Sequence, residues 1–289
     1  MSRRSLIILV VLVVAVSGAL FGFVQIDRAN FGIPRFYVWR TLSGQFHGGQ
    51  RAQVDGVSIY YETYGEGPPV LVLHGAGAFL ETMHPFIHAL ASTHTVIAVD
   101  SRGQGRSTDA PGPIRYDLMA GDMLALMDHL HIKRADVVGW SDGGIIGLAM
   151  AMKRPDRIDK LMAIGANFDV KGIDPKAFDP AQFKQEAAQV EPFYDAIAPD
   201  PRHFQTMLSK ITTLVTTEPH YTVPQLSRIR AKVLVVAGEH DMILRAHTDA
   251  LAKAIPGARE VIVPGASHFG PLEQPQVYGA MAVQFLNAP

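Results

Sequence analysis

Hydrophobic and polar positions change their spacing repeatedly along the chain from residue 57 onward. Short apolar runs, typical of strands covered on both faces of a sheet, occur between stretches with apolar residues at helical spacing. Strands that alternate with helices predict an α/β fold whose mostly parallel sheet carries helices on both faces. The predicted strands are 57–63, 70–73, 95–99, 135–140, 158–164, 233–237 and 260–263, and the predicted helices are 116–130, 145–152, 246–255 and 274–286.

One stretch, residues 167–227, departs from this alternation. It contains several prolines and scattered aromatic residues, and it has no convincing core strand. Because it lies between two predicted strands and close to the candidate site described below, we predict a helical cap over that site. The core would then have a first part at 51–166 and a second part at 228–289. Surface helices packed on the sheet are the alternative.

The N-terminus has a pattern of its own. Arg3 and Arg4 precede an uncharged apolar run over 6–24, which is about the length that spans a bilayer as a helix. The same features fit a cleavable signal peptide. We therefore predict that 1–24 is a signal anchor or a signal peptide and that 25–50 is a connector. The protein would be membrane-anchored and facing outside the cytoplasm, or exported after cleavage.

Composition narrows the chemistry. The 289 residues carry a formal net charge of −1, so no basic excess points to nucleic acid as a partner. The chain has no cysteine, which excludes disulfides, cysteine-bound zinc and a thiol nucleophile. The Gly-Gln-Gly at 103–105 lacks the full dinucleotide fingerprint, and no helix carries His-x-x-x-His with a glutamate base. We predict neither a cofactor nor a metal.

The segment 139–143 reads Gly-Trp-Ser-Asp-Gly and places Ser141 between a strand-like run and a helix-like run. This arrangement predicts a nucleophile elbow, in which a serine on a sharp strand-to-helix turn projects from the top of a sheet. Glycines two positions before and after the serine are needed because side chains there would collide in so tight a turn. A serine hydroxyl is a poor nucleophile at neutral pH, so it needs a base and an acid that orients the base.

Two later loops supply such partners in the order that this fold requires. Asp241 follows the predicted strand 233–237, and His268 follows the predicted strand 260–263. We predict that His268 is the base and that Asp241 orients it. Glu239, two residues before Asp241, is the rival acid.

The reaction also needs donors for the negatively charged oxygen of a tetrahedral intermediate. The backbone N–H of Asp142, the residue after the nucleophile, is the first candidate. The small residues after the strand 70–73 let the backbone approach a substrate, so the N–H of Ala76 is the second candidate and that of Gly77 is its alternative.

Four side chains beside these groups are the predicted substrate contacts. They are His74, Phe79, Trp140 and Asp142.

Together these blocks resemble the α/β-hydrolase superfamily over most of the chain, from about Val54 to Phe285. The resemblance rests on the elbow and on four blocks at 74–77, 100–107, 238–241 and 265–268. It implies an α/β-hydrolase fold with a helical cap insertion. In this superfamily the block at 100–107 is usually structural, with its arginine and serine bracing loops near the site.

Within the superfamily, Gly-Trp-Ser-Asp-Gly-Gly and the segment 164–167 resemble the biphenyl-hydrolase-like group, which includes valacyclovir hydrolase. Members of that group cleave α-amino-acid esters, and the aspartate after the nucleophile is held to bind the substrate amine. The resemblance implies this role for Asp142, because a carboxylate beside an oxyanion is tolerable when a cation neutralises it. The alternative is that Asp142 contributes only its N–H and turns its carboxylate to solvent or to a nearby Arg or Lys.

The sequence thus predicts a serine hydrolase that cleaves carboxylic esters of small substrates, amino-acid esters among them, through an acyl-enzyme. Lactone hydrolysis, carbon–carbon bond hydrolysis, amide or peptide hydrolysis and cofactor-free perhydrolysis are alternatives on the same three residues. A ligand-binding receptor that reuses the pocket is the non-enzymatic alternative.

Overall fold

The computed structural model describes residues 24, 25, 27 and 32–289, apart from the side chain of residue 186. Contacts divide the chain into two units, Met1–Gly44 and Gln45–Pro289. In the first unit, helix α2 (Ile33–Leu42) begins after Gly32, whose positive φ of 83° suits a residue without a side chain, and has a proline in its first turn.

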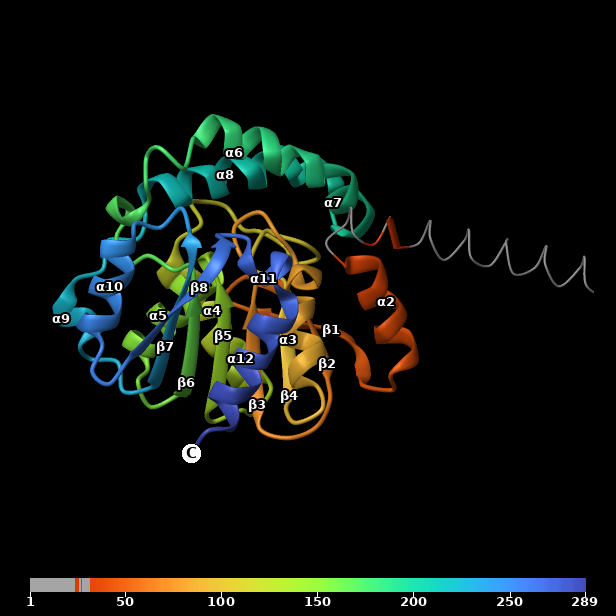
Figure 1. Cartoon of the computed structure of the whole chain (residues 1–289). Coiled ribbons are helices and arrows are strands. Elements are labelled where there is room, and N and C mark those ends of the chain that lie inside the picture. The colour runs from red at the N-terminus through yellow and green to blue at the C-terminus, as the bar shows by residue number, and fades with distance from the viewer. Residues whose placement is uncertain (1–23, 26, 28–31) are drawn as a thin grey trace, which may run out of the picture. The chain divides into compact units, whose positions relative to one another are not determined.

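The second unit is built on a sheet that has eight strands in the described part of the chain, in the order β1-β2-β4-β3-β5-β6-β7-β8 (Figure 1). The pairs β1–β2 and β2–β4 are antiparallel, and all the other neighbours are parallel. The strands are β1 (Phe46–Val54), β2 (Val57–Tyr64), β3 (Pro69–Leu73), β4 (Thr95–Val99), β5 (Ala135–Trp140), β6 (Ile158–Ile164), β7 (Lys232–His240) and β8 (Arg259–Ser267).

Helices cover both faces of this sheet. The pair α3 and α12 packs on one face, and the pair α4 and α5 packs on the other (Figure 1). The helices of the second unit are α3 (His84–Leu90), α4 (Tyr116–His129), α5 (Asp142–Lys153), α6 (Pro180–Ala187), α7 (Glu191–Ile197), α8 (Phe204–Thr217), α9 (Val223–Leu226), α10 (Arg245–Ala254), α11 (Gly270–Glu273) and α12 (Pro275–Asn287). The predicted α/β-hydrolase fold is confirmed.

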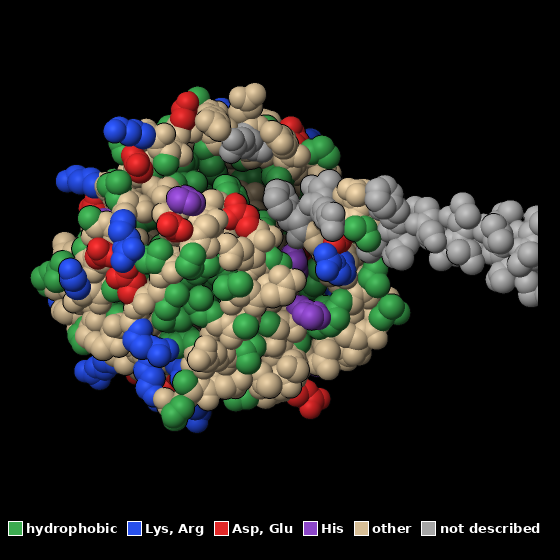
Figure 2. Space-filling view, viewed as in Figure 1, with side chains coloured by type: hydrophobic (Ala, Val, Ile, Leu, Met, Phe, Trp, Pro, Cys, Tyr) green, Lys and Arg blue, Asp and Glu red, His purple; other side chains and the backbone are tan. Residues whose placement is uncertain are grey.

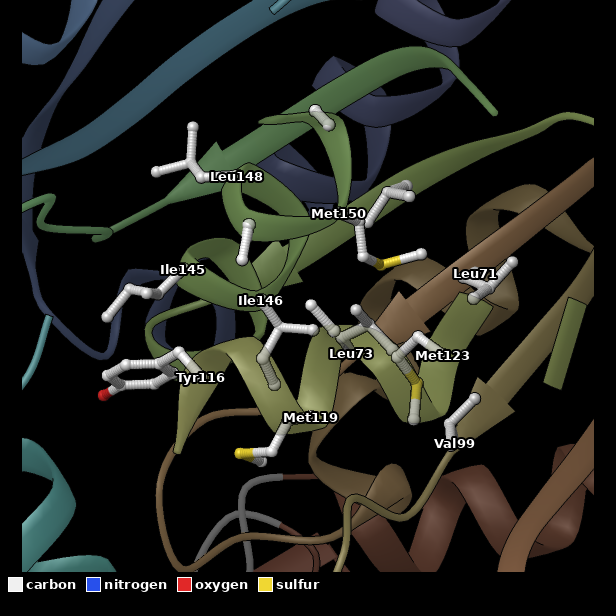
Figure 3. Close-up of a cluster of buried hydrophobic side chains, with 14 of the residues drawn as sticks. Leu71, Leu73, Val99, Tyr116, Met119, Met123, Ile145, Ile146, Leu148 and Met150 are labelled. Atoms are coloured by element: carbon white, nitrogen blue, oxygen red, sulfur yellow. The ribbon is translucent and has the colours of Figure 1, made fainter. Parts of the chain in front are cut away.

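Helix α5, which follows the elbow, is buried on almost every side. Its Ile146 and Met150 pack in one cluster with Leu73 of β3 and with Met119 and Met123 of α4 (Figure 3). Removing such side chains from water stabilises the layer by about 25 cal/mol for each Å² of apolar surface. The start of α5, directly after Ser141, is therefore held rigidly against the sheet.

Three strands differ most from the predicted elements. Strand β1 begins at Phe46, inside the predicted connector 25–50, and was not predicted because its apolar alternation is interrupted by Gly48 and Gly49. Strands β7 and β8 run on to His240 and Ser267, past their apolar stretches. Pairing with a neighbouring strand satisfies backbone groups whatever the side chains are, so these extensions leave little trace in the sequence.

The segment 167–227 contains α6, α7, α8 and α9, and Figure 1 shows α6, α7 and α8 beyond the carboxyl ends of the strands. Asp109, in the loop after β4, anchors the segment by accepting hydrogen bonds from His203 (2.9 Å) and Lys210 (2.5 Å). In the space-filling view the surface is hollowed beneath α6 and α8, and hydrophobic side chains are visible inside the hollow (Figure 2).

The predicted location of the protein requires a correction. Among the residues that the structure describes, no helix is long and apolar enough to cross a bilayer. The predicted anchor or signal, residues 1–24, lies outside the described residues except for Val24. The prediction of a membrane-anchored or exported protein with a membrane partner is therefore withdrawn.

Candidate active site

Ser141 lies on the turn between β5 and α5 with φ 55° and ψ −117°, a conformation that residues other than glycine rarely adopt. A Cβ on Gly139 would overlap the backbone of Gly143, and a Cβ on Gly143 would overlap the carbonyl of Leu73. The two glycines are therefore required by close backbone approach, as predicted. The strain at Ser141 is held by the buried strand before it and the buried helix after it.

Strands β7 and β8 pair His240 with Ser267. Asp241 and His268 are the residues that directly follow this pair, so they lie side by side. The Nδ1 of His268 is 2.7 Å from Oδ1 of Asp241, and its Nε2 is 3.1 Å from Oγ of Ser141. Because Nδ1 faces a carboxylate it carries the proton, which leaves Nε2 to accept the proton of the serine hydroxyl.

The carboxylate of Asp241 is kept ionised by its surroundings. Burial acts to raise its pKa, but the charge and hydrogen bond of His268 and the N–H groups of Ile243 and Gly238 outweigh burial, so the pKa lies below its ordinary value. Glu239, the rival acid, is exposed and accepts a hydrogen bond from the N–H of Gly265 (2.8 Å). Of the two predicted acids, only Asp241 contacts His268.

Two further residues hold the imidazole in place. The indole N–H of Trp140 donates to the carbonyl of His268 (2.9 Å), and the ring is almost completely buried. Gly165, with φ 57°, follows β6, and a Cβ there would lie 2.9 Å from Cε1 of His268. The substrate contact predicted for Trp140 remains a prediction, and the observed role of its indole N–H is to support the histidine.

The loop after β3 supplies the second predicted oxyanion donor. Pairing of Leu73 with Gly139 brings this loop beside the elbow, and a Cβ on Gly75 would lie 3.2 Å from Cβ of Ser141. The N–H of Gly77 donates to Oε1 of Gln104 (2.7 Å), so it is already engaged. Within the described residues the N–H of Ala76 has no hydrogen-bond acceptor, which makes Ala76 rather than Gly77 the available donor.

His74, a predicted substrate contact, is held by backbone groups at both ring nitrogens, and its contact with substrate remains a prediction. Its side chain is buried, its Nδ1 donates to the carbonyl of Gly75 (2.7 Å), and its Nε2 accepts from the N–H of Ser101 (3.0 Å). Burial lowers its pKa to about 4, despite the opposing effects of the Gly75 carbonyl and Glu81. A neutral ring with both nitrogens bound to backbone ties the loop after β3 to the loop after β4.

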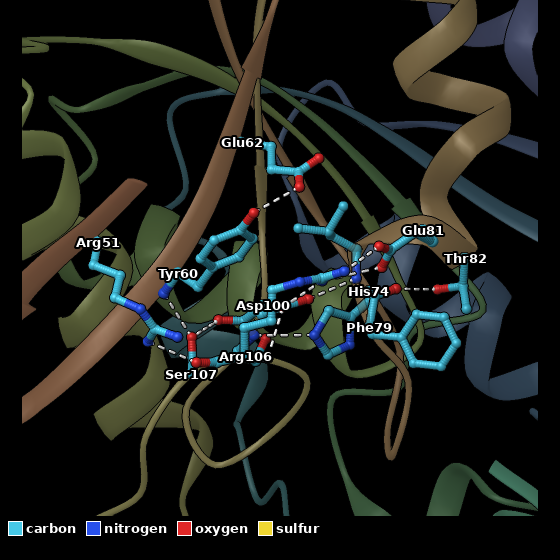
Figure 4. A network of polar contacts seen from close by, with 12 residues as sticks. Arg51, Tyr60, Glu62, His74, Phe79, Glu81, Thr82, Asp100, Arg106 and Ser107 are labelled. Atoms are coloured by element: carbon cyan, nitrogen blue, oxygen red, sulfur yellow. Dashed lines mark hydrogen bonds and ion pairs between the residues drawn. The ribbon is translucent and has the colours of Figure 1, made fainter. Parts of the chain in front are cut away.

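A buried ion network braces the same loop from behind (Figure 4). Arg106 contacts Glu81 (2.5 Å) and Asp100 (3.1 Å), and Asp100 also accepts a hydrogen bond from the N–H of Leu80. Burial and the charge of Glu81 raise the pKa of Asp100 to about 7, although Arg106 lowers it. The block 100–107 therefore supports the loop 74–79 after β3, called the oxyanion loop below after its predicted role, as the resemblance implied.

Phe79 lies at the end of the oxyanion loop and stacks on Phe193 of α7, with ring centroids 4.1 Å apart. The ring of Phe79 is largely buried by this contact. Its predicted role in substrate binding remains a prediction, and its observed role is to join the oxyanion loop to the segment 167–227.

The side chain of Asp142 is buried beside Ser141. Its Oδ1 accepts a hydrogen bond from the hydroxyl of Tyr116 (2.7 Å), while its Oδ2 is buried and has no hydrogen-bond partner within the described residues. Burial raises the pKa of Asp142 to about 6, although Tyr116 and the nearby His268 act to lower it. The carboxylate thus faces neither solvent nor a described Arg or Lys.

Sequence reasoning missed three residues of this site. Tyr116 reads as an ordinary core aromatic at the start of a helix, and Gln104 reads as part of a turn. Gly165 could have been found, because a glycine directly after a buried strand at the edge that carries the nucleophile indicates close packing there. For a metal, the described residues contain no group of three or more His, Cys, Asp or Glu that could hold one.

Comparison with known proteins links this geometry to a family. The sequence model of the Alpha/beta hydrolase family matches residues 70–280. A RutD protein named as a carbamate hydrolase, from Caulobacter sp. (strain K31), is 30% identical over an alignment that covers 82% of this chain and 98% of the relative. Serine hydrolase BPHL from Homo sapiens is 30% identical over an alignment that covers 82% of this chain and 86% of the relative. Among solved structures, Est816, described as an N-acyl homoserine lactone degrading enzyme, matches with a TM-score of 0.68 at 27% identity and covers 82% of this chain and 100% of its own.

Proposed function

Because this chain belongs to the alpha/beta hydrolase family and is a hydrolase, we propose that it cleaves carboxylic esters of small molecules through a covalent acyl-enzyme. The predicted resemblance to this superfamily and to the biphenyl-hydrolase-like group is confirmed by these relatives. The observation that carries the finer proposal is the line of contacts from Ser141 through His268 to Asp241.

In the proposed reaction Oγ of Ser141 attacks the ester carbonyl while Nε2 of His268 takes the hydroxyl proton. The tetrahedral intermediate collapses, the bond to the leaving alcohol breaks, and His268 returns the proton to that alcohol. A water molecule, deprotonated by His268, then attacks the acyl-serine; the bond to Oγ breaks, His268 returns the proton to Oγ of Ser141, and the carboxylic acid is released. Asp241 holds the proton-bearing nitrogen of His268 and stabilises the imidazolium that forms.

The N–H groups of Asp142 and Ala76 would stabilise the negatively charged oxygen of each intermediate. Asp142 is the first residue of α5, where backbone N–H groups have no partner inside the helix. Each such preorganised donor is worth about 3 kcal/mol in the transition state. The segment 167–227, which lies over the strand ends, would form the cap that selects the substrate.

A substrate panel tests this function directly. We expect the whole chain to hydrolyse p-nitrophenyl acetate, and we expect small carboxylic esters to have a higher kcat/KM than matched lactones, amides and vinylogous diketones. The reason is that the described site offers one nucleophile, one base and two donors, which suit an acyl transfer to water. Folded protein that turns over no ester would contradict the proposal and would favour the receptor alternative. A lactone preferred over every open ester would replace the proposed substrate class with that named for Est816.

A specific observation favours esters that carry an amino group near the carbonyl. The Oδ2 atom of Asp142 is buried without a partner, and leaving a charged oxygen in that state costs more than 1 kcal/mol. A substrate ammonium would supply the missing donor and would offset the repulsion between this carboxylate and the developing oxyanion. Because Oδ2 is shielded from water, the amine reaches it only with a local movement of the surrounding side chains.

The preference for an amine should depend on pH in a defined direction. Since the pKa of Asp142 is raised to about 6, the carboxylate is charged above that pH and becomes neutral as the pH falls through it. We expect kcat/KM for an aminoacyl ester to exceed that for its des-amino analogue by about tenfold to a hundredfold at neutral pH. This ratio should fall below about pH 6 as Asp142 is protonated, and above about pH 8 as the substrate amine loses its proton.

The measurement is the ratio of the two kcat/KM values across pH, because any pH effect that is common to both esters cancels in the ratio. Asp142→Asn, which keeps the backbone N–H, should abolish the preference. A wild-type ratio near one at every pH would show that Asp142 is only a backbone donor.

A further inference from the structure

The two carboxylate oxygens of Asp142 have different surroundings. Tyr116 donates its hydroxyl to Oδ1, and Oδ2 is buried with no partner in the described part of the chain. The titratable groups that face this side chain are Tyr116 of α4 and His268 of the loop after β8. No described Lys or Arg forms an ion pair with Asp142.

Tyr116 is held independently of Asp142. Its backbone N–H, at the start of α4, donates to Oε2 of Glu218 (3.2 Å), and its ring is buried in the core beside Ile145 of α5 (Figure 3). Glu218 directly follows α8, so the end of this helix in the segment 167–227 is hydrogen-bonded to the residue that binds Asp142. Tyr221 lies on the same side and donates to Asp117 (3.0 Å). The hydroxyl of Tyr116 therefore keeps its direction whether or not Asp142 is charged.

We propose that Tyr116 is a positioning residue: its hydroxyl donates to Oδ1 of Asp142, and Oδ2 is left charged and available to bind the amine of the substrate. This inference rests on the amino-ester function proposed above and deepens it.

A tyrosine suits this role because it can donate without carrying charge. Burial and the Asp142 carboxylate raise the pKa of Tyr116 well above its ordinary value, so the hydroxyl remains a neutral donor. An arginine or lysine in its place would neutralise the carboxylate and remove its attraction for a substrate cation. A phenylalanine would leave both oxygens buried without a donor, which favours the protonated acid.

The test titrates Asp142 itself and needs no substrate. The whole chain, labelled with ¹³C at its aspartate carboxyl carbons, is followed by NMR across the pH range in which carboxylates titrate, and the Asp142 signal is identified by its loss in Asp142→Asn. In Tyr116→Phe we expect the midpoint of Asp142 to move up by about one pH unit, because a donor to the charged form has been removed. The pH at which the ratio of the two kcat/KM values falls on the acidic side should rise by the same amount.

Tyr221→Phe is the matched control, since it removes a tyrosine hydroxyl from the same region without touching Asp142. It should leave the Asp142 midpoint where it is in the wild type. An unchanged midpoint in Tyr116→Phe, while the wild type prefers the amine, overturns the role of Tyr116 and leaves the substrate class standing. A wild type without amine preference overturns the substrate class, and this inference with it.

If Tyr116→Phe does not fold, 3-fluorotyrosine at position 116 provides the opposite change. The fluorine makes the hydroxyl a stronger donor while the ring and the hydrogen bond remain. The Asp142 midpoint should then move down, and a midpoint that stays or rises overturns the proposal.

Discussion

Replacing Ser141 with alanine is expected to lower kcat for an activated ester by about 10⁴-fold to 10⁶-fold. The Oγ of Ser141 is the atom 3.1 Å from Nε2 of His268, and the substitution removes the nucleophile while the N–H donors remain. Those donors and substrate binding account for the residual rate, since they still stabilise the attack of water. Initial rates on p-nitrophenyl acetate measure the effect.

Covalent labelling separates loss of the nucleophile from loss of the fold. A fluorophosphonate probe should label the wild type at Ser141 and should not label Ser141→Ala. Ser227→Ala is the matched control, because the hydroxyl of Ser227 donates only to the nearby carbonyl of Pro224 and is exposed. Labelling that persists in Ser141→Ala, or a kcat in that variant close to the wild-type value, would contradict the proposed mechanism.

The second large effect is expected at the acid that orients the base. In Asp241→Asn we expect kcat to fall by about 10⁴-fold, because an amide N–H beside Nδ1 selects the tautomer of His268 with its proton on Nε2. That tautomer cannot take the proton of Ser141. The KM should change little, because His268 separates Asp241 from Ser141. The other hydrogen bonds of the Asp241 carboxylate come from the backbone N–H groups of Ile243 and Gly238.

Glu239→Gln is the matched control for this experiment. The carboxylate of Glu239 accepts a hydrogen bond from Gly265 and is exposed, so its variant should keep a kcat close to that of the wild type. If instead Glu239→Gln loses activity and Asp241→Asn keeps it, the assignment of the acid is reversed. A loss in both variants would mean that the two carboxylates act together on the loop after β7.

The contacts of Asp142 connect this mechanism to the choice of substrate. Tyr116 lies between Asp142 and Glu218, and Glu218 directly follows helix α8 of the segment that lies over the site. Phe79 makes a second connection, from the oxyanion loop to Phe193 of the same segment. Changes in that segment would therefore act on both the carboxylate and the loop of the proposed donor Ala76.

Several features of this site could be predicted because each depends on neighbours along the chain. The elbow at Ser141 needs a buried strand, two glycines and a helix in direct succession, and the sequence shows all of these within one short stretch. Asp241 and His268 each follow an apolar strand, so their side of the sheet follows from the parallel arrangement. The block 100–107 could be assigned to loop bracing from the resemblance alone.

The hydrogen-bond partners of two polar side chains could not be predicted, because those partners are distant in sequence. His74 and Trp140 were predicted to contact substrate because they flank the oxyanion loop and the nucleophile. In the folded chain His74 is bound by the backbone of Ser101, and Trp140 is bound by the carbonyl of His268. A buried polar group must find a partner, and which partner it finds depends on loops brought together by the sheet.

The sequence by itself determined the fold and predicted Ser141 as the nucleophile with two later partners, because apolar periodicity and close-packed glycines act over short stretches of chain. Only the tertiary structure decided between Asp241 and Glu239 as the neighbour of His268, between Ala76 and Gly77 as the free donor, and which oxygen of Asp142 is free. Each of those choices is a hydrogen bond between residues far apart in sequence. Such bonds are set by the register of β7 on β8, by the loop that carries Gln104, and by the packing of Tyr116 against α5.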